Sequence, residues 1–517
     1  MRLETGLGHS HRSWAIGTTV GRAITARRGA FALALIVLVS LAFRVHVSRE
    51  CSLWLDEVAT HFEVLNPWPA ILRGPSREHP PLMHVLVKLA IGLFGVTETG
   101  LRSASLFFGC ALLVATYELC LELGLSVGRA LTVVATLALC PFFIRHGTEA
   151  RQYAILATFV TLATTRALRG ARRGRDVLGF AASALAAAFT HYFGLAYALA
   201  LLATVALGMA PLWKRLPPLG RVARIGVLLG TLALLGVVAV RALALGRYYS
   251  TSHGVAQTGI VLNRGLLGEV VSEYSFLTSE VWPAAIEPAL ALVGLSLLSF
   301  RLRGAARLLP LGIGVAPCMA ALFVSSGHFI AARYFVPSGI WYHLGACVAI
   351  FAAIDRLRAL LAGGARAKLA PLVAGLALTA ALVARLREFP VGFGVGADDY
   401  RGLQSYFVSK LAKDTRLVAY FGSFGQHLLG KEYRIGSPPI WLERFRPVRG
   451  IDRYLVVEIH IAGAERRADL ESLVERRLGI SREEWRSLPL VPLPHSRYQP
   501  AVAARLVQLP KDRAHRR

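Results

Sequence analysis

The sequence predicts a mainly α-helical, polytopic membrane protein with a soluble α/β domain at its C-terminal end, and three observations lead to this prediction. Of the 517 residues, 55% are hydrophobic and 17% are charged, a composition too apolar for one soluble domain. Long apolar runs recur until residue 386 and then stop. The net charge is +27, and most arginines lie in short loops between apolar runs, which indicates the positive-inside rule rather than nucleic-acid binding.

The membrane domain is predicted to cover residues 29–386, after a basic cytoplasmic tail at 1–28. Its first apolar run, 29–47, is long enough to span the bilayer and to remain as an anchor. The later runs cover residues 82–97, 103–121, 129–144, 152–168, 177–190, 192–210, 223–245, 282–300, 308–325, 335–354 and 369–386. By hydropathy, these runs predict roughly eleven to thirteen spans.

The arginine-rich loops set the predicted topology. We assign the loops at 166–175, 214–224, 301–307 and 356–368 to the cytoplasm. Their alternation places the loops 48–79 and 246–281 outside, together with His191, residues 327–333 and everything after residue 387. One conflict remains. With a cytoplasmic N-terminus, four crossings between residues 82 and 168 give the wrong parity for a cytoplasmic loop at 166–175, so one of these runs is re-entrant or does not cross.

The outer loop 48–79 is predicted to contain a helix that lies on the membrane surface. Apolar side chains recur there at helical spacing, at Val58, Phe62 and Leu65. Asp56 and Glu57 would stand in the first turn of this helix, where the helix dipole favours acidic residues.

Residues 387–517 are predicted to form the soluble extracytoplasmic α/β domain. The pattern predicts strands at 417–421 and 454–458 and helices at 398–411 and 468–478. No P-loop or glycine-rich nucleotide fingerprint is present. The six cysteines of the chain have no CxxC spacing, which indicates neither a zinc site nor a disulfide framework.

The adjacent acids Asp56 and Glu57 are the first candidates for chemistry. They could be two solvated acids that cap the surface helix, because loop carboxylates are common and only buried ones are costly. Alternatively, one of them is a general base for an acceptor hydroxyl, which requires hydrogen-bond reach and a partly desolvated site. The residues alone leave both interpretations open.

A group of polar residues near the starts of two apolar runs supplies candidates for substrate binding. His79 stands just before the second run, while Glu149, Arg151 and Tyr153 follow the helix-breaking Pro141. A guanidinium binds phosphate in a planar, bidentate manner, so Arg151 is a candidate for a lipid phosphate. Interface snorkelling explains one arginine easily, but it explains the whole cluster less well.

Two further pairs complete the candidates. His191 and Tyr192 stand in the break between two short apolar runs, where a lone histidine is more often structural than a ligand. Arg333 and Tyr334 begin a run at the predicted outer face. The positive-inside rule disfavours arginine on that side, which makes Arg333 a stronger functional candidate than the cytoplasmic arginines.

Taken in order, these pieces resemble the GT-C superfamily of membrane glycosyltransferases. The resemblance is to the family 39-like branch that holds the protein O-mannosyltransferases and the lipid A aminoarabinose transferases. The matching pieces are Leu55-Asp56-Glu57, His79-Pro80-Pro81-Leu82, Glu98 with Arg102, Pro141 with Glu149-Ala150-Arg151-Gln152-Tyr153, Thr190-His191-Tyr192 and Ala332-Arg333-Tyr334. Singly they are weak, but they keep the order of the family over about residues 30–355.

The resemblance implies a polyprenyl-phosphate sugar donor, an inverting transfer and an active site on the outer face of a bacterial plasma membrane. Asp56 resembles the acceptor-activating base of the family, and Glu57 its acidic neighbour. Arg151 and Arg333 match positions near the donor phosphate. His79, Glu149 and His191 match more loosely. The acceptor would be a glycan, a lipid or a protein, and nothing in the sequence fixes the sugar.

Two alternatives and the metal question stay open. A secondary transporter or lipid flippase would show internal repeats and mid-span charges, and neither is clear in the sequence. A non-catalytic membrane scaffold would have the soluble tail as its working part. A divalent metal is undecided, since the acids and histidines named above could supply ligands but have no metal-ligand spacing along the chain. No nucleic-acid partner is expected.

Overall fold

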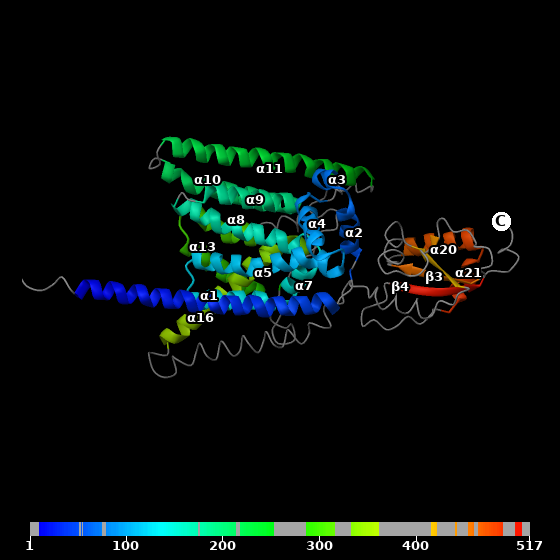
Figure 1. Ribbon diagram of the computed structural model, residues 1–517, viewed down its shortest axis with the longest axis horizontal. Helices are drawn as coiled ribbons and strands as arrows, with labels where there is room; N and C mark the ends of the chain where they lie inside the picture. The colour runs from blue at the N-terminus through cyan, green and yellow to red at the C-terminus, as the bar shows by residue number, and fades with distance from the viewer. Residues whose placement is uncertain are drawn as a thin grey trace, which may run out of the picture. The chain divides into compact units, whose positions relative to one another are not determined.

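The structure is a computed structural model that describes residues 10–50, 53, 55–74, 79–173, 176–213, 218–252, 274, 286–315, 332–360, 415–420, 440–441, 453–459, 464–489 and 502–508. The chain forms two compact units. The first comprises Met1–Val47 and Glu63–Phe389, and the second comprises Ser48–Phe62 and Pro390–Arg517. Figure 1 shows the elements of both units.

The first unit is helical. Its α-helices are α1 (Ser10–Glu50), α3 (Trp68–Arg73), α4 (Leu82–Phe94), α5 (Glu98–Glu122), α6 (Val127–Leu139), α7 (Pro141–Thr148), α8 (Tyr153–Arg173), α9 (Val177–Thr190), α10 (Tyr192–Trp213), α11 (Pro218–Ser252), α13 (Ile286–Arg301), α14 (Leu309–Gly314) and α16 (Val336–Leu360). Two 3₁₀ helices, η1 (Gly304–Leu308) and η2 (Ala332–Phe335), connect some of them.

Several of these helices can cross a membrane. Among the described residues, four are long and apolar enough, namely Arg27–Arg49, Glu98–Glu122, Gly220–Ala244 and Arg333–Leu360, and the bent pair α6–α7 makes a fifth if it counts as one span. Three further apolar helices are shorter. A multi-pass membrane protein is therefore confirmed, whereas the larger span count predicted from hydropathy is not reached by the described helices.

Helices α5 and α8 run side by side in the same direction, which defines two ends of the helix bundle. Near their starts, the Ser105 hydroxyl donates to the Arg151 carbonyl at 3.1 Å. Near their finishes, Arg169 Nε donates to Glu122 at 3.0 Å. We call these the Arg151 end and the Arg169 end.

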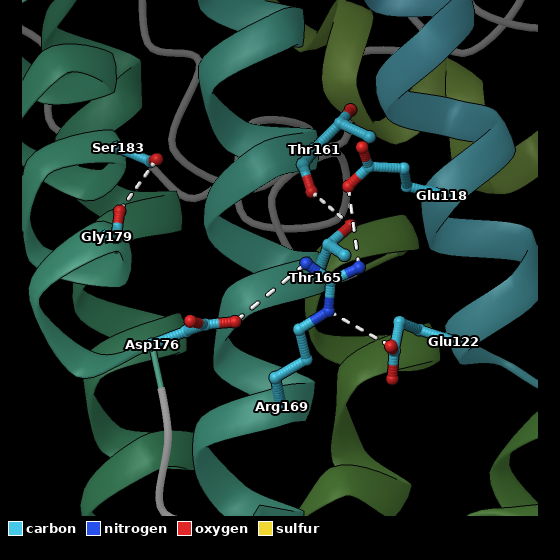
Figure 2. A network of polar contacts seen from close by, with 8 residues as sticks. All are labelled: Glu118, Glu122, Thr161, Thr165, Arg169, Asp176, Gly179 and Ser183. Carbon is cyan, nitrogen blue, oxygen red and sulfur yellow. Dashed lines mark hydrogen bonds and ion pairs between the residues drawn. The ribbon is translucent and has the colours of Figure 1, made fainter.

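The Arg169 end is held by a polar network, shown in Figure 2. Besides Glu122, Arg169 lies 3.5 Å from Glu118 on α5 and 3.8 Å from Asp176, just before α9. One guanidinium therefore joins the C-terminal ends of α5 and α8 to the start of α9, and three carboxylates compensate its charge.

Helices α6 and α7 return the chain to the Arg151 end, with a bend of 64° between them. Pro141 opens α7 and cannot continue the hydrogen-bond ladder of α6. Helix α16 runs in the opposite direction to α6, since Arg129 at the start of α6 makes a two-oxygen ion pair of 2.6 and 2.7 Å with Asp355 near the end of α16. Helix α16 therefore begins at the Arg151 end.

Helix α4 does not cross the bundle, and this resolves the parity conflict in the predicted topology. His79 just before α4 contacts Arg151 at 2.9 Å, and Ser105 in the second turn of α5 contacts the same residue. The segment from His79 to Ser105, which contains α4 and the first turns of α5, therefore begins and ends beside Arg151. Helix α4 has 13 residues, about 20 Å, so the prediction of a span at 82–97 is wrong.

The bundle is packed closely through small residues, most tightly between α13 and α16. A Cβ atom added to Gly294 would lie 1.7 Å from the Gly345 carbonyl oxygen, and one added to Gly345 would lie 2.4 Å from the Ala291 carbonyl oxygen. Small residues permit such backbone approach between helices in a membrane, where apolar burial alone gives little drive to associate.

The second unit combines the outer-loop segment with the C-terminal elements. Helix α2 (Leu55–Leu65) begins in this unit and carries Asp56 and Glu57 in its first turn, which confirms the predicted helix. The sheet has the order β2-β1-β3-β4. Its strands are β1 (Thr415–Tyr420), β2 (Ile440–Trp441), β3 (Arg453–Ile459) and β4 (Val502–Gln508), accompanied by α20 (Ala464–Leu478) and α21 (Arg482–Ser487).

In this sheet, β1 pairs in parallel with β2 and β3, and β3 pairs antiparallel with β4. A small core of Tyr454, Val456, Leu470, Val474 and Trp485 is buried against it. Strands β1 and β3 and helix α20 agree with the elements predicted at 417–421, 454–458 and 468–478. The helix predicted at 398–411 lies outside the described residues.

Candidate functional site

The centre of the candidate site is a contact between His79 and Arg151 at the Arg151 end. The two residues are 72 positions apart, and Arg151 Nη2 lies 2.9 Å from His79 Nε2. Arg151 is buried, on the short link between α7 and α8. His79 is held just before Pro80 and Pro81, which precede α4. The fold therefore brings together two of the residues that the sequence predicts for substrate binding.

This contact fixes the tautomer of His79. An arginine has no acceptor, so His79 Nε2 must accept and the ring proton must be on Nδ1. His79 Nδ1 is buried and has no hydrogen-bond partner among the described residues. The pair consequently offers N–H donors and no acceptor to a ligand, a combination suited to an oxygen-rich anion.

Histidine and aromatic rings surround the pair. The ring of His191 lies 5.8 Å from that of His79 and 5.4 Å from that of Tyr334, measured between centroids. Tyr334 stacks on Phe193 at 5.5 Å and lies 6.3 Å from Tyr153. Four of the predicted residues thus line one side of the Arg151 end, contributed by the link before α4, the break between α9 and α10, η2 and α8.

Arg333 lies beside this ring cluster. Its guanidinium carbon is 5.7 Å from the centre of the Tyr334 ring, within the range of a cation–π interaction. The side chain is half-buried. Two arginines from widely separated parts of the sequence therefore lie beside rings of the same cluster, Arg151 beside His79 and Arg333 beside Tyr334.

Glu149 is paired with neighbouring residues of the same segment. It accepts from Arg145 Nε at 2.9 Å and lies 3.1 Å from His146 Nδ1. The His146 ring in turn makes an edge contact with Tyr153 at 4.9 Å. Glu149 is thereby held in an ion-pair network that orders the link leading to Arg151.

The burial of these groups fixes their charge. Burial lowers the pKa of His79 well below its usual range, and the neighbouring Arg151, His191 and His84 lower it further. Burial and the Arg151 charge lower the pKa of His191 to about 3. Both histidines are therefore neutral at neutral pH.

Glu149 is ionised under the same conditions. Burial raises the pKa of Glu149, but the attraction and hydrogen bonds of His146 and Arg145 outweigh it and bring the pKa to about 2. The site combines arginine cations and neutral imidazole rings with one ionised carboxylate, Glu149, which is paired with Arg145 and His146.

A second histidine supports the first from α4. His84 is fully buried and lies 2.6 Å from Glu63 at the end of α2, and its ring centroid is 6.4 Å from that of His79. One turn further along α4, Lys88 donates to the Val64 and Asn66 carbonyls at 2.8 Å each. These contacts fix α4 against the chain that precedes it and so fix the position of His79.

The structure places Tyr192 in the first unit and Asp56 and Glu57 in the second. Tyr192 begins α10, and its electrostatic neighbour is Arg241 of α11. Asp56 and Glu57 belong to the second unit, where Glu57 is fully buried and Asp56 is half-buried. The Asp56 carbonyl accepts from the Thr60 hydroxyl at 3.0 Å, an ordinary contact within the helix.

Gln152 and Arg44 are among the buried polar residues that were not predicted as candidates from the sequence. Gln152 is fully buried, and neither atom of its amide has a hydrogen-bond partner among the described residues. Arg44 is fully buried within α1. The sequence signal for Arg44 was an arginine inside an apolar run, whereas nothing in the sequence distinguishes Gln152 from an interface residue.

A metal site can be looked for among the side chains of the described residues. Within those ranges, no group of three or more histidine, cysteine, aspartate or glutamate side chains could hold a metal ion. The His79 ring lies near those of His191 and His84, and the other ring neighbours of His191 are Phe193 and Tyr334.

Comparison with known proteins gives similarities of structure only. No protein-family model matches the chain, and no curated protein matches it. A solved structure of ArnT from Cupriavidus metallidurans bound to undecaprenyl phosphate is similar, with 14% identity and a TM-score of 0.48, covering 91% of this chain and 97% of that one.

Two other solved structures are similar. The Archaeoglobus fulgidus oligosaccharyltransferase, in complex with Zn and sulfate, has 12% identity and a TM-score of 0.45, covering 88% of this chain and 70% of that one. Arabinofuranosyltransferase AftD from Mycobacteria has 15% identity and a TM-score of 0.45, covering 93% and 40%. All three are GT-C superfamily glycosyltransferases, the superfamily that the sequence resembles. At these identities and TM-scores, the function has to be argued from the residues of the chain itself.

Proposed function

We propose that the protein is a membrane glycosyltransferase that moves a sugar from a polyprenyl-phosphate donor to an acceptor hydroxyl. The observation that carries this proposal is the His79–Arg151 pair at one end of a bundle of apolar helices, in which Arg151 is buried and His79 is half-buried. It offers only N–H donors, and Arg333 adds a second guanidinium beside the same rings. A phosphate with an apolar tail fits such a site, because its head meets cations while its tail stays along the helices.

In the proposed reaction, Asp56 takes the proton of the acceptor hydroxyl. The hydroxyl oxygen then attacks the anomeric carbon, and the bond from that carbon to the phosphate oxygen breaks with inversion. Arg151 and Arg333 stabilise the charge that develops on the leaving polyprenyl phosphate. His79 donates from Nδ1 to a phosphate oxygen, and Glu57 orients its neighbour. The acceptor is a glycan, a lipid or a protein.

We further propose that the Arg151 end and the C-terminal domain face outward from a bacterial plasma membrane. Arg129 and Arg169 lie at the opposite end of the helices, as do residues 166–173 and 356–360, the described parts of two predicted cytoplasmic loops. The positive-inside rule favours this orientation. Since α4 does not cross, the parity of the spans agrees with it.

The test is consumption of the donor by the purified protein. Polyprenyl-phosphate sugars are offered with a mixture of acceptors, and the release of polyprenyl phosphate is measured by mass spectrometry. Loss of a general base costs on the order of a hundredfold or more in rate, so Asp56→Asn should abolish release while donor binding persists. Glu57→Gln should be milder.

Glu483→Gln is a matched control, because Glu483 is exposed in the first turn of another helix of the same unit. Wild-type turnover by Asp56→Asn, at equal protein level, would show that the two acids only cap α2. A flippase would move the lipid between leaflets without consuming it, so transport without release would overturn the proposal.

A further inference from the structure

Arg44 is a buried cation inside the first apolar helix. It lies in the apolar stretch Arg27–Arg49, most of whose residues are not buried, yet Arg44 itself is completely buried. Arg27 and Arg28 of the same helix are exposed. An ionisable side chain placed within a span is costly unless it is paired, and it usually marks a functional position.

The guanidinium of Arg44 holds the bend between α6 and α7. Its Nη1 donates to the Ser40 hydroxyl one turn earlier, and its Nη2 donates to the Phe143 carbonyl at 3.3 Å. The Ser40 hydroxyl donates to the Ala138 carbonyl at 3.4 Å. Ala138 and Phe143 lie on either side of Pro141, where the helix ladder is interrupted and carbonyl groups need other donors.

The same side chain fits against the segment that leads to the candidate site. A Cβ atom added to Gly147 would lie 2.8 Å from Arg44 Nε, and one added to Gly109 would lie 3.3 Å from it. The Cβ of an alanine at 109 would also lie 3.2 Å from Gly147 Cα. Helices α1, α5 and α7 therefore meet at one point, and Gly147 is only four residues before Arg151.

We propose that Arg44 is a positioning residue for the donor site. By bracing both sides of the α6–α7 bend, it sets where the link 149–152 places the Arg151 guanidinium. The effect of Arg44 on phosphate binding by Arg151 rests on the proposed function. The bracing itself is a claim about this chain that can be measured without any ligand.

The first arm of the test measures the bracing. Hydrogen–deuterium exchange is followed by mass spectrometry on the purified protein in detergent, comparing wild type, Arg44→Met and Arg28→Met. Loss of hydrogen bonds from a charged donor should speed exchange in peptides from 141–152 on the order of tenfold, with 177–190 unchanged. Arg28→Met is the matched control, because Arg28 is exposed on the same helix.

The second arm measures the consequence, with undecaprenyl phosphate as the probe. Because small misplacements of a positioned group have large effects, affinity per folded molecule should fall about tenfold in Arg44→Met. Arg44→Lys should recover part of it. Gly147→Ala keeps the Arg44 charge but displaces its side chain, so it should lower the affinity as Arg44→Met does. If Arg44→Met does not accumulate, Gly147→Ala provides the test. Gly128→Ala, which meets no atom within 4 Å, is its control.

The outcomes separate the two proposals. Unchanged exchange of 141–152 in both Arg44→Met and Gly147→Ala would overturn the role of Arg44. Faster exchange with wild-type affinity would also overturn it, since Arg44 would then only stabilise the fold. A wild-type protein that does not bind undecaprenyl phosphate would instead overturn the proposed function, and the exchange arm would still decide whether Arg44 braces the bend.

Discussion

At the residue scale, the site depends on the contact between Arg151 and His79. Arg151 donates to His79 and keeps further N–H groups in a rigid plane. A lysine at the same place could bond to His79 but would present a single point of charge. Because the His79 ring is neutral, Arg151 supplies the positive charge of the pair, and His79 accepts a hydrogen bond that orients the guanidinium.

The first residue-scale prediction follows from this geometry. Arg151→Lys should weaken the binding of undecaprenyl phosphate on the order of tenfold although the charge is kept, because the bidentate fork is lost. Titration followed by native mass spectrometry measures the change. Arg28→Lys, at an exposed position, should bind as wild type does. Equal affinity in Arg151→Lys would remove Arg151 from the phosphate site.

The second residue-scale prediction concerns pH. Burial, with Arg151, lowers the pKa of His191 to about 3, from an unfolded value near 6.5. The unfolded chain therefore binds a proton that the folded chain does not, and stability falls as the pH drops from about 6.5 toward 3. His79, whose pKa is also lowered, acts in the same direction.

Thermal unfolding in detergent between pH 7 and pH 4 measures this loss. In His191→Gln the decline should be shallower by up to about 1.4 kcal/mol per pH unit. The matched control is His46→Gln, since His46 is exposed on α1. A decline as steep as that of the wild type in His191→Gln would show that His191 is not the buried neutral group described above.

At the element scale, helix ends and small residues place the site. The bend at Pro141 turns α7 so that the link carrying Glu149 and Arg151 reaches the same end as His79. Helix α16 begins at that end, directly after η2, which carries Tyr334, and it packs backbone to backbone on α13. Each of these candidate binding residues therefore lies where a helix begins or ends.

The element-scale prediction tests the α13–α16 contact. A methyl group at Gly294 would collide with the Gly345 carbonyl, and overpacking of this kind costs typically 1–3 kcal/mol. Gly294→Ala should therefore lower the apparent melting temperature in detergent. Gly226→Ala, where nothing lies within 4 Å, should leave it unchanged or raise it slightly. An unaltered melting temperature in Gly294→Ala would mean that the two helices do not approach this closely.

At the scale of the whole molecule, the direction of the helices assigns each loop to one of two ends. Thr99 lies at the Arg151 end, before Ser105, and Ser126 lies at the Arg169 end, between α5 and α6. Both side chains are exposed. A membrane-impermeant thiol reagent can therefore distinguish the two orientations of the chain.

We expect Thr99→Cys to be labelled in intact cells and Ser126→Cys to be labelled only after the membrane is opened, because the positive-inside rule places the Arg169 end in the cytoplasm. The labelling of the wild-type chain, which has six cysteines of its own, is subtracted from that of each variant. The reverse pattern would invert the topology and remove the outer-face transfer from the proposed function.

The sequence by itself determined the class of the molecule and most of its candidate residues. Apolar runs and arginine placement depend on transfer free energies that each segment carries with it, so the spans at α1, α5 and α16 could be predicted. The helix with Asp56 and Glu57 and the break at His191 follow from local spacing. Candidate polar residues at helix ends were found because charge beside a membrane is costly.

Only the tertiary structure decided which of these residues meet. Hydropathy cannot tell a crossing from a short helix that stays at one end of the bundle, so the run 82–97 reads as a span in the sequence, whereas in the structure His79 before α4 and Ser105 on α5 both contact Arg151. The tautomer of His79 required its partner to be known. Arg44 looked like an isolated charge, and its role depends on carbonyl groups nearly a hundred residues away. Such contacts depend on distances between segments, which no local pattern in the chain encodes.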